Sequence, residues 1–169
     1  LFYRYELSIE LNESWKAASS QAIVAAYGEL ATEFCKTVLI TENCKEVGNI
    51  NIIEDRKTDV DDTGDFHPRI PKPSQLYLNP LGTLICCVSK DVSPKLSNSF
   101  TSKLLSLVPS GPILVLSSHH YGSLQGSYAP QENENCVVHS LSSPAFLKYK
   151  AVYPPLPQPA TVSSFPAAS

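Results

Sequence analysis

Two serines and two histidines follow a short apolar stretch, and they are the residues of this chain best suited to catalysis. Ser117, Ser118, His119 and His120 come directly after residues 113–116, Ile-Leu-Val-Leu. A serine hydroxyl deprotonated by a histidine is a common nucleophile in acyl transfer. The Gly-x-Ser-x-Gly pattern of a nucleophile elbow is absent. We therefore predict hydrogen bonds that stabilise a strand end, with a hydrolase- or phosphorylase-like site at 113–118 as the alternative.

Cysteine could supply a second kind of nucleophile, paired with a histidine as Cys87 with His119 or Cys136 with His139. No local sequence pattern supports either pair. The chain contains five cysteines, Cys35, Cys44, Cys86, Cys87 and Cys136, without a Cys-x-x-Cys spacing. We predict free, buried thiols in a reducing compartment rather than a disulfide framework or a zinc site. Cys86 and Cys87 should point to opposite faces of a strand.

Two further patterns resemble ligand sites but lack required residues. The acidic run 59–64 resembles a calcium loop, yet Ile70 occupies the position of the bidentate glutamate. His67 near this run is predicted to be exposed. Gly28 follows an apolar run, as a phosphate-binding glycine does, but no Gly-x-Gly-x-x-Gly is present. The sequence therefore predicts no catalytic, cofactor-binding or metal-ligating residue.

The composition limits the possible classes of protein. A chain of 169 residues is long enough for one domain with a hydrophobic core. The net charge of −3 provides no general attraction to nucleic acid. No apolar run approaches the roughly 18 residues that span a bilayer, and residues 1–6 do not resemble a signal peptide. The chain contains no methionine, which predicts a fragment or a trimmed domain.

The candidate serines and histidines require a buried strand and its neighbours to position them. Residues 113–116 show no polar alternation, which predicts a central strand covered on both faces. Residues 81–89 form a second apolar run, and residues 93–108 have helical spacing after the Ser93-Pro94 start. Strand, helix and strand in this order predict a βαβ unit. The expected fold class is α/β, a layered sheet with helices packed on its faces.

Further elements are expected on the amino-terminal side. Residues 1–11 alternate apolar and polar residues, which predicts a half-buried strand near an edge. Residues 15–36 fit either one long helix or a strand to Tyr27, a turn at Gly28 and a helix, and we favour the second. The β-branched residues of 36–41 favour a strand over an extension of that helix. Short strands are also predicted at 47–54 and 75–78, with a turn at Asn79-Pro80.

The remaining segments are predicted to be loops and a tail. We expect a single α/β domain at residues 1–153, with long loops at about 55–74 and 121–135. A short strand is predicted at 136–140, and a short helix beginning at Ser143-Pro144. Residues 154–169 contain five prolines, which predicts an extended proline-rich tail.

Several segments together resemble the proteasome assembly chaperone 1 family. They are 22–28 (AIVAAYG), 84–88 (LICCV), 113–116 (ILVL), 141–148 (LSSPAFLK), 155–159 (PLPQP) and 165–168 (FPAA). This resemblance implies a non-enzymatic chaperone of 20S proteasome assembly, without a cofactor, in the cytoplasm and also the nucleus. It implies binding to a second assembly chaperone and to proteasome alpha-type subunits. The family's C-terminal hydrophobic-Tyr-x motif is not found at 165–169, so no tail residue is carried over.

Overall fold

The computed structural model describes residues 4–13, 15, 20–55, 70–118, 138–146 and 153–156. The chain divides into two compact units, with the division after Ser118. We call them the sheet unit, described up to Ser118, and the smaller unit, described at 138–146 and 153–156. Most of the two predicted loops and most of the predicted tail lie outside the described residues. The domain boundaries at 153 and 154 stay a prediction.

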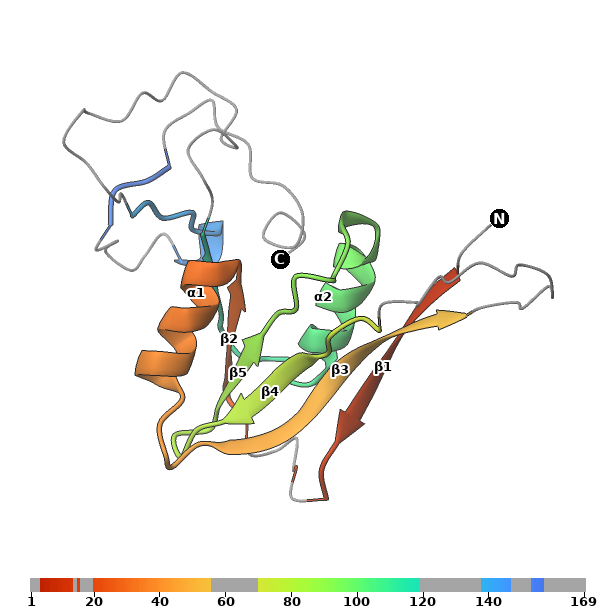
Figure 1. Ribbon diagram of the computed structural model, residues 1–169. Helices are drawn as coiled ribbons and strands as arrows, with labels where there is room; N and C mark the ends of the chain where they lie inside the picture. The colour runs from red at the N-terminus through yellow and green to blue at the C-terminus, as the bar shows by residue number, and fades with distance from the viewer. Residues whose placement is uncertain are drawn as a thin grey trace, which may run out of the picture. The chain divides into compact units, whose positions relative to one another are not determined.

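Six strands form one mixed sheet in the sheet unit (Figure 1). They are β1 (Arg4–Leu11), β2 (Ala22–Tyr27), β3 (Lys45–Asp55), β4 (Ser74–Leu78), β5 (Thr83–Cys87) and β6 (Ile113–Ser117). Their order in the sheet is β1-β3-β4-β5-β2-β6. The pairs from β1 to β5 are antiparallel, whereas β5, β2 and β6 are parallel.

Helices lie on both faces of this sheet. Helix α1 (Glu29–Phe34) and the π-helix η2 (Cys35–Leu39) follow β2. The 3₁₀ turn η3 (Pro94–Leu96) and helix α2 (Ser97–Ser106) connect β5 to β6. Figure 1 shows α1 in front of the sheet and α2 behind it. The predicted βαβ unit and the layered α/β fold class are confirmed, since β5 and β6 are both parallel to β2, which lies between them.

A separate hydrophobic core stabilises each face. On the α2 side, Phe100 and Leu104 pack with apolar strand residues that include Ile50, Leu76 and Leu84. On the α1 side, Ala31 and Cys35 pack with Ala26, Ile85 and Cys87. Cys86 belongs to the first core and Cys87 to the second, which confirms their predicted opposite orientation.

The prediction of a central strand at 113–116 was wrong. Strand β6 is at the end of the sheet order and pairs only with β2 among the described strands. Leu114 is 54% exposed, because α1 does not cover this last strand completely. The apolar run is therefore an edge strand, and the fully buried central strand is β5.

The strand favoured at 36–41 was also wrong. Residues Cys35–Leu39 continue the helix as η2, with the Ile40 N–H donating to the Cys35 carbonyl at 2.8 Å. Helical continuation keeps Cys35 and Leu39 packed in the same core. This gain in apolar burial outweighs the β-branched preference of Thr37 and Val38 for a strand.

The other described elements agree more closely with the sequence. Strand β2, Gly28 and α1 form the favoured strand, turn and helix. Strand β1 is an edge strand on which Leu7 is buried and Glu6 is exposed. At the predicted Asn79-Pro80 turn, the Asn79 Oδ1 accepts hydrogen bonds from two backbone N–H groups of the hairpin.

The smaller unit is less regular than predicted. Within 136–140, residues 138 and 139 are not in a strand, and Ser140 makes one isolated bridge to Pro155. The Ser140 N–H donates to the Pro154 carbonyl, and the Leu156 N–H donates back to the Ser140 carbonyl. The helix predicted to begin at Ser143-Pro144 is the 3₁₀ turn η5 (Pro144–Phe146) in its described part.

Candidate functional site

The predicted serines lie where the parallel strands β2 and β6 end. Ser117 is the exposed last residue of β6, and the Ser118 N–H donates to the Tyr27 carbonyl at 3.2 Å. Gly28 begins the turn into α1 with φ +91°. A Cβ on Gly28 would lie 2.5 Å from the Ser118 Oγ and 2.9 Å from its carbonyl oxygen. Ser118 and Gly28 therefore fill this end of the sheet by direct contact.

A catalytic pair at these serines would need a histidine partner. His119 and His120 lie outside the described residues, so neither is placed against Ser117 or Ser118. Glu29 occupies the first turn of α1 and would repel an anion at Gly28. The described atoms at this strand end therefore hold the turn into α1 and form no phosphate cradle.

The loop after β5 contains polar groups that are not among the candidates predicted from the sequence. They form hydrogen bonds with one another and with neighbouring residues. The Ser89 N–H donates to the Ser74 Oγ at 2.8 Å, and the Asp91 N–H donates to the Ser89 Oγ at 3.2 Å. The Asp91 carboxylate accepts a hydrogen bond from the Lys72 N–H at 2.8 Å. These groups stabilise the connection between β5 and the following helix.

The four described thiols of the sheet unit are free; Cys35, Cys86 and Cys87 are buried, and Cys44 is half-buried. Burial, with a smaller contribution from Cys87, raises the pKa of the Cys35 thiol from 9.0 to about 11. Burial also raises the pKa of Cys86 and of Cys87. Lys36 partly opposes the shift of the Cys87 pKa, and Glu33 adds to it. Because a thiol must ionise to act as a nucleophile or a metal ligand, burial disfavours both roles for Cys35, Cys86 and Cys87 at neutral pH.

The other members of the predicted Cys–His pairs fall mostly outside the described residues. His119 and Cys136 lie outside the described residues, and His139 is half-buried in the smaller unit. The acidic run 59–64 and His67 also lie outside them, whereas Ile70 is described and 87% exposed. Within the described ranges, no three His, Cys, Asp or Glu side chains are grouped closely enough to hold a metal ion.

The buried thiols predict a dependence of stability on pH. An unfolded Cys35 thiol ionises near pH 9, whereas the folded one keeps its proton to about pH 11. Between these values the unfolded chain binds fewer protons, so the free energy of unfolding should fall as the pH rises. Urea unfolding at about pH 7.5 and pH 10 measures the fall. Cys35→Ala should show a smaller fall, and an equal fall in both chains would contradict the assignment.

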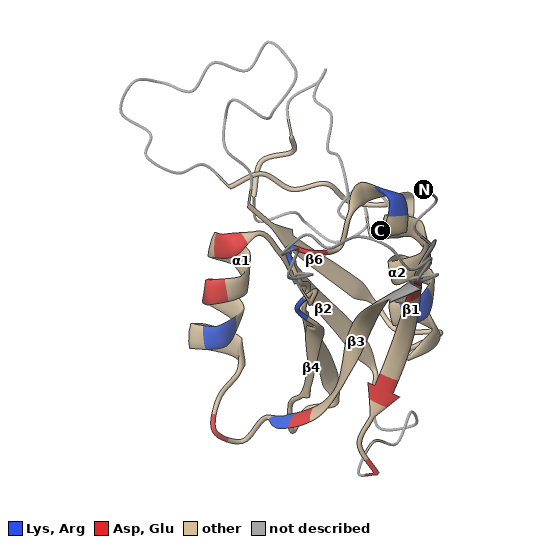
Figure 2. Cartoon of the chain, turned by 45° about the vertical axis from the view of Figure 1, so that its right-hand side comes forward, with Lys and Arg blue, Asp and Glu red and all other residues tan. Residues whose placement is uncertain are grey.

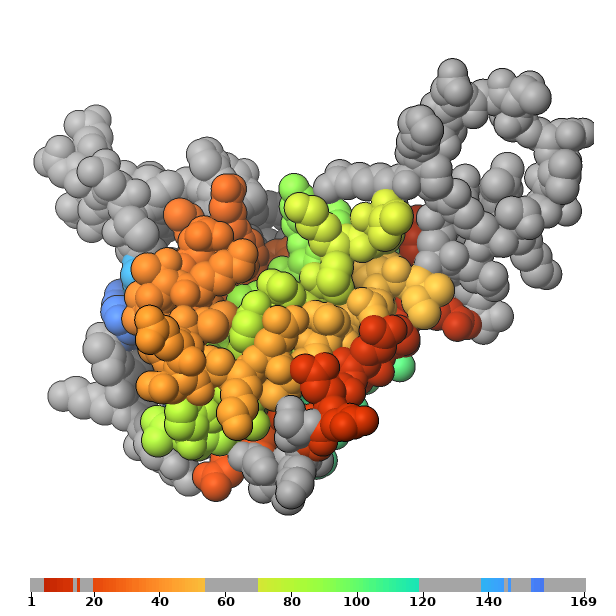
Figure 3. Space-filling model, turned by 60° about the horizontal axis from the view of Figure 1, so that its bottom comes forward, coloured from red at the N-terminus to blue at the C-terminus, as the bar shows by residue number. Residues whose placement is uncertain are grey.

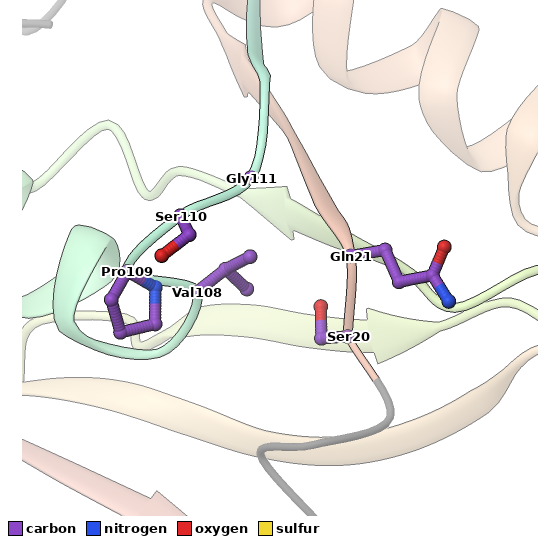
Figure 4. A pocket seen from close by; sticks show the side chains of 6 residues that line it. All are labelled: Ser20, Gln21, Val108, Pro109, Ser110 and Gly111. Carbon is purple, nitrogen blue, oxygen red and sulfur yellow. The ribbon is translucent and has the colours of Figure 1, made fainter.

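A hollow of about 220 Å³ lies at the opposite end of β2 and β6. It is lined by Ser20, Gln21, Val108, Pro109, Ser110 and Gly111 (Figure 4). Figure 4 shows the Gln21 side chain pointing away from the side chains of Val108, Pro109 and Ser110. Ligands of parallel sheets bind outside the carboxyl ends of the strands, and this hollow is at the amino ends. The hollow is therefore not at the end of the sheet where a substrate would be expected to bind.

A second hollow, of about 320 Å³, lies between β1 and the start of α2. It is lined by Tyr5, Glu6, Leu7, Leu96, Ser99 and Lys103. The residues around it include neither a cysteine nor a histidine, so it offers no thiolate nucleophile, no imidazole base and no soft metal ligand. Among the helices that the structure describes, none has the length and apolar character that crossing a membrane requires.

Three exposed apolar side chains on α1 and η2 form the most unusual surface of the sheet unit. Leu30, Phe34 and Val38 are 72%, 48% and 53% exposed. Their spacing of four residues places them on one side of the helix. We call these three residues the α1 apolar row. The four-residue spacing of Leu30, Phe34 and Val38 can be seen in the sequence. It predicts an apolar row only if the helix continues through Val38, and a strand is the favoured prediction there.

The α1 apolar row lies on the side of α1 that faces β6. Ala31 and Cys35, one position further along the chain than Leu30 and Phe34, are the residues that contact the sheet. Glu33 and Lys36 influence the Cys87 pKa and so lie on the side nearer β5. A helical projection at 100° per residue places the row on the opposite flank from these two charges.

Strand β6 contributes Leu114 to the same side of the molecule. Leu114 pairs with Val24, whose side chain packs in the α1-side core, so Leu114 points to this face. On the far side of α1, the same face continues over β3 and β1 (Figure 3). It is mainly polar there, with Glu10 paired with Asn49 and Ser8 with Asn51. An apolar surface therefore lies at the β6 edge of the sheet, and a mainly polar one lies at the β1 edge.

The fold and this surface place the protein in the class of layered α/β domains. It has a six-stranded mixed sheet, with the α1 apolar row beside the edge strand β6. A comparison with protein-family models found no match to this chain. A comparison with curated proteins found no significant match.

Proposed function

We propose that this protein is a non-enzymatic chaperone that assists assembly of the 20S proteasome. It binds a second assembly chaperone and alpha-type proteasome subunits through its surface. The family resemblance of segments such as 141–148 supports the identity of these partners. The α1 apolar row, exposed on a helix that is otherwise packed against the sheet, is the observation that carries the protein-binding role.

The α1 apolar row has the chemistry of a protein contact. Removing a large apolar side chain from water stabilises a complex by about 1.5–3 kcal/mol if burial is complete. Phe34 is the kind of aromatic anchor that dominates many interfaces. The charged residues of α1, coloured in Figure 2, lie outside the row, with Glu33 and Lys36 on the opposite flank of the helix.

The strand end that an enzyme would use supports the same proposal. Ser118 contacts Gly28 and is held by the Tyr27 carbonyl, and Cys35, Cys86 and Cys87 are buried with raised pKa values. A hydrolase or phosphorylase would need an open polar pocket at this end with a base facing Ser117 or Ser118. The described residues provide an exposed apolar flank instead.

Affinity purification tests the proposal directly. The full-length protein is tagged in its own cells, and the proteins that copurify are identified by mass spectrometry. We expect a second assembly chaperone and free alpha-type subunits, with little mature proteasome. Recovery of neither class would overturn the proposal, and the hydrolase-like alternative would then be tested with Ser117→Ala and Ser118→Ala.

Phe34→Glu should abolish recovery of the second chaperone, since it places a charge in the centre of the α1 apolar row. Loss of a buried aromatic contact and desolvation of the new carboxylate should weaken binding by about 3 kcal/mol, or more than 100-fold. Lys36→Glu is the matched control, because Lys36 is exposed on the same helical segment and lies on the opposite flank from the row.

Both variants should fold, since Phe34 and Lys36 are exposed. Circular dichroism and urea unfolding check this before the binding comparison. Equal recovery of the second chaperone with both variants would exclude the α1 apolar row as its binding surface.

A further inference from the structure

We propose that Ser143 is a phosphorylation site for a proline-directed serine kinase. Its position in the smaller unit, between Ser140 and the η5 turn, combines the required sequence with the required exposure. Ser143 precedes Pro144, and residues 141–144 are all exposed. The Ser143 hydroxyl has no hydrogen bond to another described residue. This proposal does not depend on the assembly function.

The Ser-Pro pair is chemically suited to such an enzyme. Proline lacks a backbone N–H, so it can occupy an apolar subsite in which another residue would leave a donor unpaired. Proline also favours an extended backbone for the residue before it, as in a peptide laid along a groove. In the transfer, the Ser143 Oγ bonds to the γ-phosphorus of ATP and the bond to the β-phosphate oxygen breaks. ADP leaves, and a carboxylate of the kinase takes the hydroxyl proton.

The chain contains a second Ser-Pro pair with the same sequence but buried neighbours. Comparing the two pairs shows whether exposure decides which serine is phosphorylated. Ser93-Pro94 has the same local form as Ser143-Pro144, because each serine carbonyl accepts a hydrogen bond from the N–H three residues later, at 2.9 Å. The neighbours of the two pairs differ. Val92 and Ser97, which flank Ser93-Pro94, are buried, whereas Leu141 is 66% and Phe146 41% exposed. A kinase could bind 92–97 only after α2 leaves the sheet.

The experiment uses the intact folded chain, ATP with Mg²⁺ and a cyclin-dependent or mitogen-activated protein kinase. Mass spectrometry of peptides locates and quantifies the phosphate. We expect phosphate on Ser143, absent from Ser143→Ala, reduced at least about tenfold by Pro144→Ala, and unchanged by Ser93→Ala. Ser143→Thr should keep the reaction, because it retains the hydroxyl.

A synthetic peptide of residues 138–148 shows whether the bare sequence is a substrate. Phosphorylation of both the peptide and the folded chain at Ser143 supports the proposal. Phosphorylation of the peptide alone would overturn it, since the folded chain would then withhold the site. Failure of both, or equal phosphorylation of Ser93 in the folded chain, would also overturn it.

Discussion

Phe100→Ala should lower the free energy of unfolding of the sheet unit by about 4 kcal/mol. Phe100 is the largest fully buried side chain of the described residues, and it is 0% exposed. It projects from α2 into the core that also contains Leu76, Leu84 and Leu104. Strands pack against Phe100 on one side and its own helix on the other, so neighbouring side chains can fill the vacated space only partly. The remaining cavity adds its own cost to the transfer free energy lost with the ring.

Urea unfolding followed by the fluorescence of Trp15, which packs against the same core, measures this loss. Phe100→Leu should cost only about 1 kcal/mol, since it keeps most of the apolar volume. Ser99→Ala, at an exposed position on the same helix, should change stability by less than about 0.5 kcal/mol. A loss below about 1 kcal/mol for Phe100→Ala would show that α2 does not pack on the sheet as described.

Gly28→Ala should be nearly as destabilising, by about 3 kcal/mol. Gly28 has φ +91° and ψ 161°, a backbone region that is strained for any residue with a Cβ. The new Cβ would also lie 2.9 Å from the Ser118 carbonyl oxygen, which belongs to the backbone and cannot rotate away. Either the turn into α1 or the end of β6 must therefore shift.

Two comparisons separate the causes of the Gly28→Ala effect. Gly82→Ala introduces a Cβ at another positive φ, 77°, and should cost about 1 kcal/mol from backbone strain. Ser118→Ala removes the hydroxyl 2.5 Å from the new Cβ and should recover only part of the Gly28→Ala loss, because the carbonyl contact remains. Complete recovery in the double variant would assign the effect to the Ser118 side chain alone.

Local patterns in the sequence were sufficient for much of the fold. Alternating residues predicted β1, the apolar run 81–89 predicted β5, and the Ser93-Pro94 start with helical spacing predicted α2. These predictions are correct because propensity, spacing and capping are properties of neighbouring residues, and here they agree with burial. Gly28 was identified as a turn for the same reason. The opposite orientation of Cys86 and Cys87 follows from the period of a strand.

Only the tertiary structure decided which strand was central and which surface was exposed. Residues 113–116 are as apolar as residues 84–87, yet β6 is at an edge and β5 is in the centre. Strand order depends on contacts between residues distant in sequence, and a run of apolar residues does not encode it. The π-helix at Cys35–Leu39 likewise formed against local preference, and it packs Cys35 and Leu39 into the α1-side core. That continuation of the helix exposes Val38 and completes the α1 apolar row, so the candidate binding surface appears only when the chain is folded.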